Sequence, residues 1–262
     1  MVLPSLYLSH GSPMLALDDT PTTRFWQSLP QLAGPALRGI VCISAHWHSE
    51  VTTVTGGHPD KPVLHDFYGF PPALYQQHWQ MSDARALAQQ VTEHLNAAGV
   101  QARHEPQRPI DHGAWVPMRF AWPAGELPLV QVSLNQHADG GFHWQLGEAL
   151  APLREQGLLI VGSGSIAHNL RLLQPQVTDE RPGAEAEVFV RHVQDAVNRF
   201  ERQRLCDWPS LPLAARYIPT PEHYYPLLVA TGAARGDKPR WLHESWSMRE
   251  LDLFAVCFGG QA

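Results

Sequence analysis

The sequence predicts an α/β fold: a single domain spanning 1–262, with a central, mostly parallel or mixed sheet and helices on both of its faces. A chain of 262 residues suits one large domain with a substantial core. Short apolar runs rich in β-branched residues alternate with segments of helical period, which is the pattern of layered α/β proteins. Several of these runs are apolar throughout, as expected of strands buried on both faces.

The apolar runs predict strands, because each is bounded by Gly, Pro or polar residues. In chain order they lie at 3–9, 39–45, 51–55, 127–134, 157–163 and 252–259. Segments of helical period lie between them, at 22–33, 82–99, 143–155 and 184–204. Ser82 is a good N-cap and Gly99 suits the position just beyond a helix, so these two residues delimit the second helix.

The segment 56–80 fits neither class of element. It is rich in Gly, Pro and aromatic residues and lacks a clear period. Long irregular loops in compact domains are usually lids or binding loops, so we expect this segment to serve the functional site.

Composition excludes several classes of function. The formal net charge is −6 without a run of like charges, so we expect no nucleic-acid partner and no binding to an anionic membrane surface. No apolar stretch reaches the roughly 18 residues of a membrane span, and the first residues lack the basic start of a signal peptide. Cys42, Cys206 and Cys257 lie far apart, which predicts free thiols. We therefore expect a cytoplasmic protein, a monomer or small homo-oligomer, that acts on a small organic substrate.

Histidines stand at positions that such a fold brings together. Five of them end apolar runs or lie in tight turns: His10, His46, His112, His168 and His223. In an open α/β sheet, ligands bind in the crevice outside the carboxyl ends of the strands. Because neutral imidazole is a good ligand for zinc and iron, the sequence predicts a metal site in this crevice.

Two of these histidines have a neighbour that competes for the same role. His48 would share a face with His46 if the strand 39–45 continued, but His46 is closer to the strand end. His223 follows Thr220 and Pro221, a good N-cap and first residue for a helix whose positive end keeps the imidazole neutral. Glu222 is the alternative ligand there, and adjacent helical residues point about 100° apart, so we expect His223 alone to face the metal.

Two other histidines have local features of their own. His168 follows a GSGS turn, whose glycines permit close backbone approach and whose N–H groups can hold an anionic oxygen. The alternative for His168 is a histidine at a helix start that is hydrogen-bonded to the backbone. His112 follows Asp111, which is either an outer partner of the site or a turn former, and the sequence favours the turn.

A set of ordered motifs covers nearly the whole chain. From His10 to Met248 these are SHGSP, SAHW, DFYGFP, DHGAWVPM, GSGSIAHNL, PEHYYPLL and SMR. Together they resemble the class III extradiol ring-cleavage dioxygenases, and most closely the 4,5-DOPA dioxygenase branch. The resemblance implies a single-domain α/β fold and one divalent metal ion per chain.

The resemblance also assigns roles to the histidines. It implies that His10, His46 and His223 hold the metal, and that His168 is an acid/base beside it that can approach zinc as an additional ligand. His112 matches a further histidine of the pocket. The better-studied protocatechuate-type members use two histidines and a glutamate to hold iron, and His223 departs from that pattern. Fe(II) is expected for dioxygenase activity, while a three-histidine site also binds Zn(II) readily.

The function expected from these observations is extradiol cleavage of a catechol, such as a DOPA-like substrate, with O2. His168 is the candidate for proton transfer, assisted by His112. His65 and the aromatic side chains of Trp47, Phe67, Tyr68 and Trp115 are expected to line the substrate pocket, although such side chains are more often plain core.

Two rival functions remain. A zinc hydrolase would use three histidines to lower the pKa of a bound water, with Glu222 or Asp111 as base. A catalytically inert zinc-binding member of the family is the other.

Overall fold

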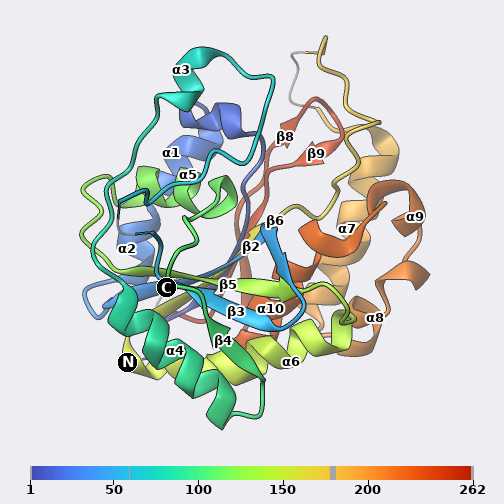
Figure 1. Ribbon diagram of the computed structural model, residues 1–262. Coiled ribbons are helices and arrows are strands. Elements are labelled where there is room, and N and C mark those ends of the chain that lie inside the picture. The colour runs from blue at the N-terminus through green and yellow to red at the C-terminus, as the bar shows by residue number, and fades with distance from the viewer. Residues whose placement is uncertain (1, 59, 178–180, 261–262) are drawn as a thin grey trace.

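The computed structural model describes residues 2–58, 60–177 and 181–260. Within these ranges, eight strands form one sheet in the order β4-β3-β5-β2-β6-β1-β10-β7. The sheet lies between two layers of helices, as the sequence predicted (Figure 1). The strands of this sheet are β1 (Ser5–Ser9), β2 (Gly39–Ser49), β3 (Thr52–Thr55), β4 (Ala102–His104), β5 (Leu129–Asn135), β6 (Leu158–Gly164), β7 (Pro239–His243) and β10 (Ala255–Phe258).

The sheet is mixed, with a parallel centre. Strands β5, β2, β6 and β1 run parallel to one another, so their carboxyl ends share one edge. Strand β10 is antiparallel to β1, and β3 is antiparallel to β5. A small separate ribbon pairs β8 (Trp246–Ser247) with β9 (Leu251–Asp252).

Two apolar cores flank the sheet. One core contains the side chains of α4, α6, α7 and α10 and one face of the central strands. The other core contains α1, α2, α5 and the opposite face. The helices are α1 (Pro21–Gln27), α2 (Leu29–Ala33), α3 (Pro72–Tyr75), α4 (Arg85–Ala97), α5 (His112–Ala121), α6 (Gly140–Leu150), α7 (Ala184–Asn198), α8 (Arg202–Cys206), α9 (Ala214–Tyr217) and α10 (Tyr225–Ala234).

Several predicted helices have different limits in the structure. The segment 22–33 forms two helices, α1 and α2, because Ser28 and Pro30 interrupt the hydrogen bonding. The segment 184–204 is divided where Phe200 takes a positive φ of 50°. Helix α6 passes into a 3₁₀ turn, Ala151–Gln156, beside a proline.

The predicted N-cap of the second helix is wrong. Ala84 occupies the N-cap of α4, and the hydroxyl of Ser82 donates instead to the carbonyl of Gly125. Gly99 follows the helix with a φ of 84°, as predicted. The sequence identified the helix but not its first turn, because the competing acceptor of Ser82 lies on a distant segment.

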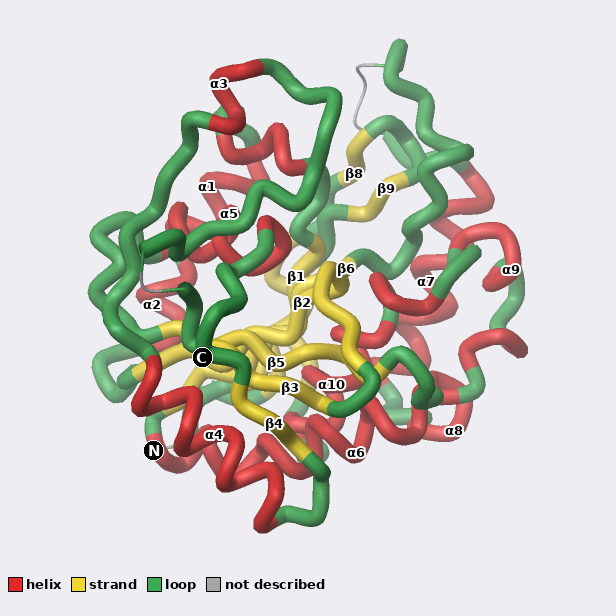
Figure 2. Tube along the Cα trace, viewed as in Figure 1, coloured by secondary structure: helices red, strands yellow, loops and turns green. Residues whose placement is uncertain are grey.

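The segment 56–80 is mostly loop, with α3 as its helix, and it extends beyond the sheet (Figure 2). Its inner part runs beside the start of α5, since Ile110 exchanges hydrogen bonds with Pro62 and Leu64 over 2.9 and 2.7 Å. Across the described ranges, none of the helices has both the length and the apolarity needed to cross a bilayer.

The thiols of Cys42, Cys206 and Cys257 are free, and those of Cys42 and Cys257 are buried, as predicted.

Candidate metal centre

All five predicted histidines meet at one edge of the sheet. The ring centroid of His46 lies 4.0 Å from that of His112 and 4.9 Å from those of His10 and His223. The ring of His168 stacks on His223, with centroids 3.4 Å apart and planes 6° from parallel. Side chains separated by more than 200 positions along the chain therefore form one cluster.

The central parallel strands deliver three of these rings. His10 follows β1, His46 lies near the end of β2, and His168 follows β6. Because β2, β6 and β1 are adjacent and parallel, their carboxyl ends lie together. Strand β2 continues to Ser49 past the predicted end, and its pairing with β5 shifts register between Ile43 and His48.

His48 does not join the cluster. Its Nε2 atom lies 2.8 Å from the carbonyl oxygen of Ala45, a hydrogen bond to its own strand. The irregular register after Ile43 breaks the simple alternation on which the choice between His46 and His48 rested.

Close backbone packing brings His223 to the site. His223 ends a 3₁₀ turn, Pro221–His223, that leads into α10. A Cβ atom on Gly164 would lie 2.1 Å from the carbonyl oxygen of His223, so glycine is required at the end of β6. The backbone N–H of Ser165 donates to that same carbonyl over 2.9 Å. The GSGS turn thus binds the protein's own backbone.

Thr220 lies at the predicted N-cap position but forms no capping hydrogen bond. Thr220 is the N-cap of the 3₁₀ turn, yet its side chain accepts no backbone N–H. Its hydroxyl donates instead to Oε1 of Glu222 over 2.6 Å.

His112 begins α5, a helix that the sequence analysis did not predict. The stretch contains Gly113 and Pro117, two residues that disfavour a helix interior. Asp111 is fully buried at the N-cap and accepts hydrogen bonds from Ser44 and Gln131, so it is not a simple turn former.

Pro117 has a consequence for His10. A proline has no N–H, so the carbonyl of Gly113, four residues earlier, lacks its helical donor. The hydroxyl of Ser163 donates to this carbonyl, and its oxygen lies 2.9 Å from Nδ1 of His10. Since a hydroxyl has one proton, the oxygen accepts from Nδ1–H, and Nε2 of His10 keeps its lone pair.

Three ring nitrogens converge in a way that suits a metal ion. Nε2 of His46 lies 2.9 Å from Nε2 of His10 and 3.3 Å from Nε2 of His223. Ligand nitrogens about 2.0–2.1 Å from one tetrahedral ion are about 3.3 Å apart. Facing lone pairs repel one another unless a cation lies between them. The donor set therefore fits one divalent metal ion.

The electrostatic environment keeps these ligands neutral. Burial and the ring of His112 lower the pKa of His46 to about 3. Burial and the neighbouring imidazoles also lower the pKa values of His10 and His223 well below the usual range. A neutral imidazole has a lone pair to offer at neutral pH, so no proton has to be removed before a metal binds.

Glu222 and His168 occupy the far side of His223. Nδ1 of His223 is buried without a hydrogen-bond partner, and the nearest carboxylate oxygen, Oε1 of Glu222, is 3.5 Å away. Ligand atoms of His168, Glu222 and His223 lie within 4.8 Å of one another. Burial lowers the pKa of His168 to about 4 despite the charge of Glu222, so this ring is also neutral.

Asp66 belongs to the cluster and was missed by the sequence analysis. One of its carboxylate oxygens lies 3.0 Å from Nδ1 of His112, and the other lies 3.8 Å from Nδ1 of His46. Its only sequence signal is its position in the DFYGF motif, between His65 and Phe67.

Asp252 is a second missed carboxylate, and it is fully buried. It accepts hydrogen bonds from the hydroxyls of Ser9 and Ser165 over 2.6 and 2.8 Å, and from the N–H of Ala167 over 2.7 Å. Ser9 precedes His10 and Ala167 precedes His168, so one carboxylate ties together the segments that carry these two rings.

The predicted pocket residues are distributed unevenly. The ring of Phe67 lies 5.6 Å from that of His112, while Tyr68 is 92% exposed. Trp115 is fully buried, and its indole N–H donates to the carbonyl of Leu64.

His65 and Trp47 are the other two predicted pocket residues. The ring of His65 is 5.8 Å from that of Trp115. Trp47 is buried under the guanidinium of Arg108, which lies 4.7 Å from the centre of its ring. Phe67 is the predicted aromatic side chain in direct contact with the cluster.

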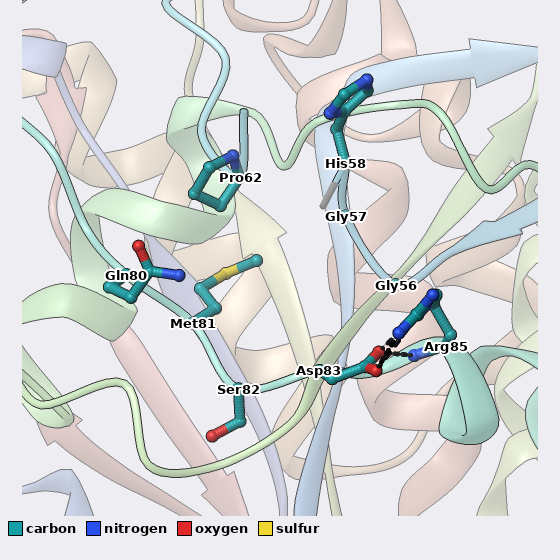
Figure 3. Close-up of a pocket in the computed structure, with 9 residues that line it drawn as sticks. All are labelled: Gly56, Gly57, His58, Pro62, Gln80, Met81, Ser82, Asp83 and Arg85. Carbon is teal, nitrogen blue, oxygen red and sulfur yellow. Dashed lines mark hydrogen bonds and ion pairs between the residues drawn. The ribbon is translucent and has the colours of Figure 1, made fainter. Parts of the chain in front are cut away.

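A separate cavity of about 240 Å³ lies where the segment 56–80 leaves and rejoins the body of the protein (Figure 3). Its walls include His58 on one side and Met81 on the other. The charged groups Asp83 and Arg85 on its wall pair with each other over 2.5 Å. None of the clustered histidines lines it.

Comparisons with known proteins agree with this geometry. Residues 4–259 match the family model described as the catalytic LigB subunit of aromatic ring-opening dioxygenase. The chain is 35% identical to the 4,5-DOPA dioxygenase extradiol of Escherichia coli K12, over 98% of this chain and 95% of the relative. It is 34% identical to the Beta vulgaris protein of the same name, over 92% and 91%.

A solved structure agrees with the fold. An uncharacterized protein from Escherichia coli K12 matches with a TM-score of 0.83 at 31% identity, covering 98% of this chain and 100% of that chain.

Proposed function

This chain belongs to the LigB family of aromatic ring-opening dioxygenases, and we propose that it is a metal-dependent extradiol dioxygenase that cleaves a catechol with O2. The observation that carries this proposal is the convergence of the Nε2 atoms of His10, His46 and His223 at 2.9 and 3.3 Å. These three side chains are the proposed ligands of one divalent ion. When bound, the ion supplies open coordination positions for both catechol oxygens and for O2.

The remaining histidines act on protons. A catechol has to lose a hydroxyl proton when it binds, and a proton has to be delivered later in the reaction. His168 is the proposed proton-transfer group, because its neutral ring stacks on His223, one of the three proposed ligands. His112 assists by accepting a hydrogen bond from the substrate at its free ring nitrogen.

The pocket supports an aromatic substrate of this kind. Phe67, which the loop 56–80 carries, offers an apolar edge beside His112. The names of the relatives make a DOPA-like catechol the first substrate to test.

The test is reconstitution of the metal-free protein. Loading with Fe(II) under anaerobic conditions, followed by a catechol and O2, should give equimolar O2 uptake and a ring-opened product. Zinc-loaded protein serves as the matched control and should take up no O2. Turnover of esters or amides by the zinc form, or stoichiometric metal binding without any turnover, would contradict the proposal.

A further inference from the structure

We propose that Asp66 is a positioning residue that holds His112 as the tautomer with its proton on Nδ1 and a free lone pair on Nε2. The inference rests on the proposed function, because His112 has a task there only if a substrate proton or hydroxyl meets its Nε2 atom. It assigns a role to the segment 56–80 that is separate from binding a substrate.

One oxygen of Asp66 accepts two hydrogen bonds from His112. A single oxygen, Oδ1 of Asp66, lies 3.0 Å from the ring atom Nδ1 and 3.0 Å from the backbone N of His112. The side chain of His112 is 6% exposed and that of Asp66 is 17% exposed, so little water competes for these bonds. Among the described residues, no other side chain forms a hydrogen bond with this ring.

The tautomer follows from the chemistry of the acceptor. The backbone N–H of His112 can only donate, and it donates to the same Oδ1 atom of Asp66 that meets the ring, so this oxygen is an acceptor. A carboxylate has no proton to give and only accepts. Nδ1 of His112 must therefore be the donor, and in the neutral ring Nε2 then has no proton.

The backbone fixes Asp66 at this position. The loop 62–64 pairs with Ile110, two residues before His112, through hydrogen bonds of 2.9 and 2.7 Å. The indole N–H of Trp115 donates to the carbonyl of Leu64 over 3.0 Å. These bonds set the register of the loop against α5, and that register places the carboxylate against the first residue of the helix.

Asp66 is not placed as a direct ligand. Its second oxygen is 3.8 Å from Nδ1 of His46, and the Nε2 atom of His46 points to His10 and His223 instead. The carboxylate thus lies behind two rings of the cluster, the arrangement by which outer carboxylates orient metal-site histidines.

The experiment compares Asp66→Ala with Asp66→Asn in zinc-loaded protein without substrate. Nitrogen-15 NMR of labelled histidine reports which ring nitrogen is protonated, and a His112→Gln variant identifies the His112 signals. We expect Nδ1 protonation in the wild type. In Asp66→Ala the proton should move to Nε2 or be shared between the nitrogens. Asp66→Asn should restore the wild-type pattern, because its amide oxygen still accepts from both N–H groups.

Kinetics of the iron form provide the second readout. Asp66→Ala should lower kcat by about 10- to 100-fold with little change in KM, and bound metal should stay stoichiometric. Asp66→Asn should recover most of the rate. His58→Ala, in the same loop but away from the cluster, is the matched control and should match the wild type.

The outcomes separate this inference from the proposed function. A His112 ring that stays protonated on Nδ1 in Asp66→Ala would overturn the inference, as would loss of metal from that variant, which would make Asp66 a ligand. The NMR readout needs no turnover, so an inactive wild type would refute the proposed function while the tautomer still decides the role of Asp66.

Discussion

The histidine cluster has two halves that are held by different carboxylates. Asp252 holds the half that contains His10 and His168, is fully buried, and bonds to hydroxyls and a backbone N–H. Asp66 holds the half that contains His46 and His112, comes from a loop, is partly exposed, and bonds directly to a ring. Asp252 thus positions the first half through residues next to its histidines, whereas Asp66 positions the second half through a histidine ring itself.

Because of this difference, one site can combine fixed geometry with a histidine that exchanges protons. The partners of Asp252 are neutral groups that keep their protons throughout a reaction, so its bonds serve geometry alone. The partner of Asp66 is an imidazole, whose protonation pattern the carboxylate selects.

The largest effect is expected where the two halves meet at the metal. His10→Ala and His46→Ala each remove one of three ligands, from different halves, and both should lose most bound metal, as should His223→Ala. Metal analysis after dialysis against a weak chelator measures this. His192→Ala, on the surface of α7, should retain the metal.

The choice between His223 and Glu222 sharpens that test. His223→Gln should abolish metal binding, while Glu222→Gln should leave it nearly intact, because the Glu222 carboxylate is 3.5 Å behind the ring. The reverse order would assign the third ligand to Glu222.

The next effect concerns catalysis in the buried half. His168→Ala should keep iron on His10, His46 and His223, but lose turnover by roughly 100- to 10,000-fold, as for a missing general acid or base. Single-turnover kinetics with a metal assay on the same sample separate the two. An iron-free variant would make His168 a ligand and pass the proton-transfer role to His112.

The two carboxylates should differ in their effect on stability. Asp252→Ala removes the acceptor of the Ser9 hydroxyl and of the buried Ala167 N–H, and leaves Ser165 with the carbonyl of Ala167 alone, which should cost about 3 kcal/mol of unfolding free energy. Asp66→Ala should cost roughly 1 kcal/mol, since water reaches its partly exposed position. Urea unfolding of the metal-free proteins measures both, and equal losses would refute the distinction between the halves.

The last prediction is a pH dependence of stability that comes from a histidine outside the cluster. Burial lowers the pKa of His143 to about 4, whereas the unfolded chain has a value near 6.5. Between about pH 6.5 and pH 4 only the unfolded state takes up this proton, so the unfolding free energy decreases as the pH is lowered through this range. In this range His143 should change the unfolding free energy by about 1.4 kcal/mol per pH unit.

The control is His143→Gln, which cannot titrate. Its unfolding free energy in the metal-free protein should fall less steeply with decreasing pH than that of the wild type. Parallel curves would show that His143 is not neutral in the folded state. The difference between the metal-free and metal-saturated forms of this variant then reports protonation of the clustered histidines.

The sequence predicted the half of the site that depends on strand ends. His10, His46 and His168 were identified because apolar runs end next to them and parallel strands share an edge. Helix α5 was missed because Pro117 and Gly113 disfavour a helix interior. The predicted cluster formed, although the helix that carries His112 was not expected.

The carboxylates were not predictable in the same way. Asp252 meets Ser9 across 243 positions of sequence, and Asp66 meets His112 across 46. No local pattern distinguishes a buried acceptor from a surface aspartate when its donors are so far away. Ser163 likewise gains its role only because Pro117 leaves a carbonyl of another segment without a donor.

The position of β1 in the sheet governs the order in which the site can form during synthesis. Residues 5–9 are synthesised before their strand partners, 158–164 and 255–258. The first strand therefore has no neighbouring strand until residues 158–164 are made, and it gains its second neighbour only with residues 255–258. A nascent chain stalled before residue 252 lacks both the last strand partner of β1 and the acceptor of Ser9. The three proposed ligands include His223, so a metal ion held by all of them could not guide the steps of folding that precede the synthesis of this residue.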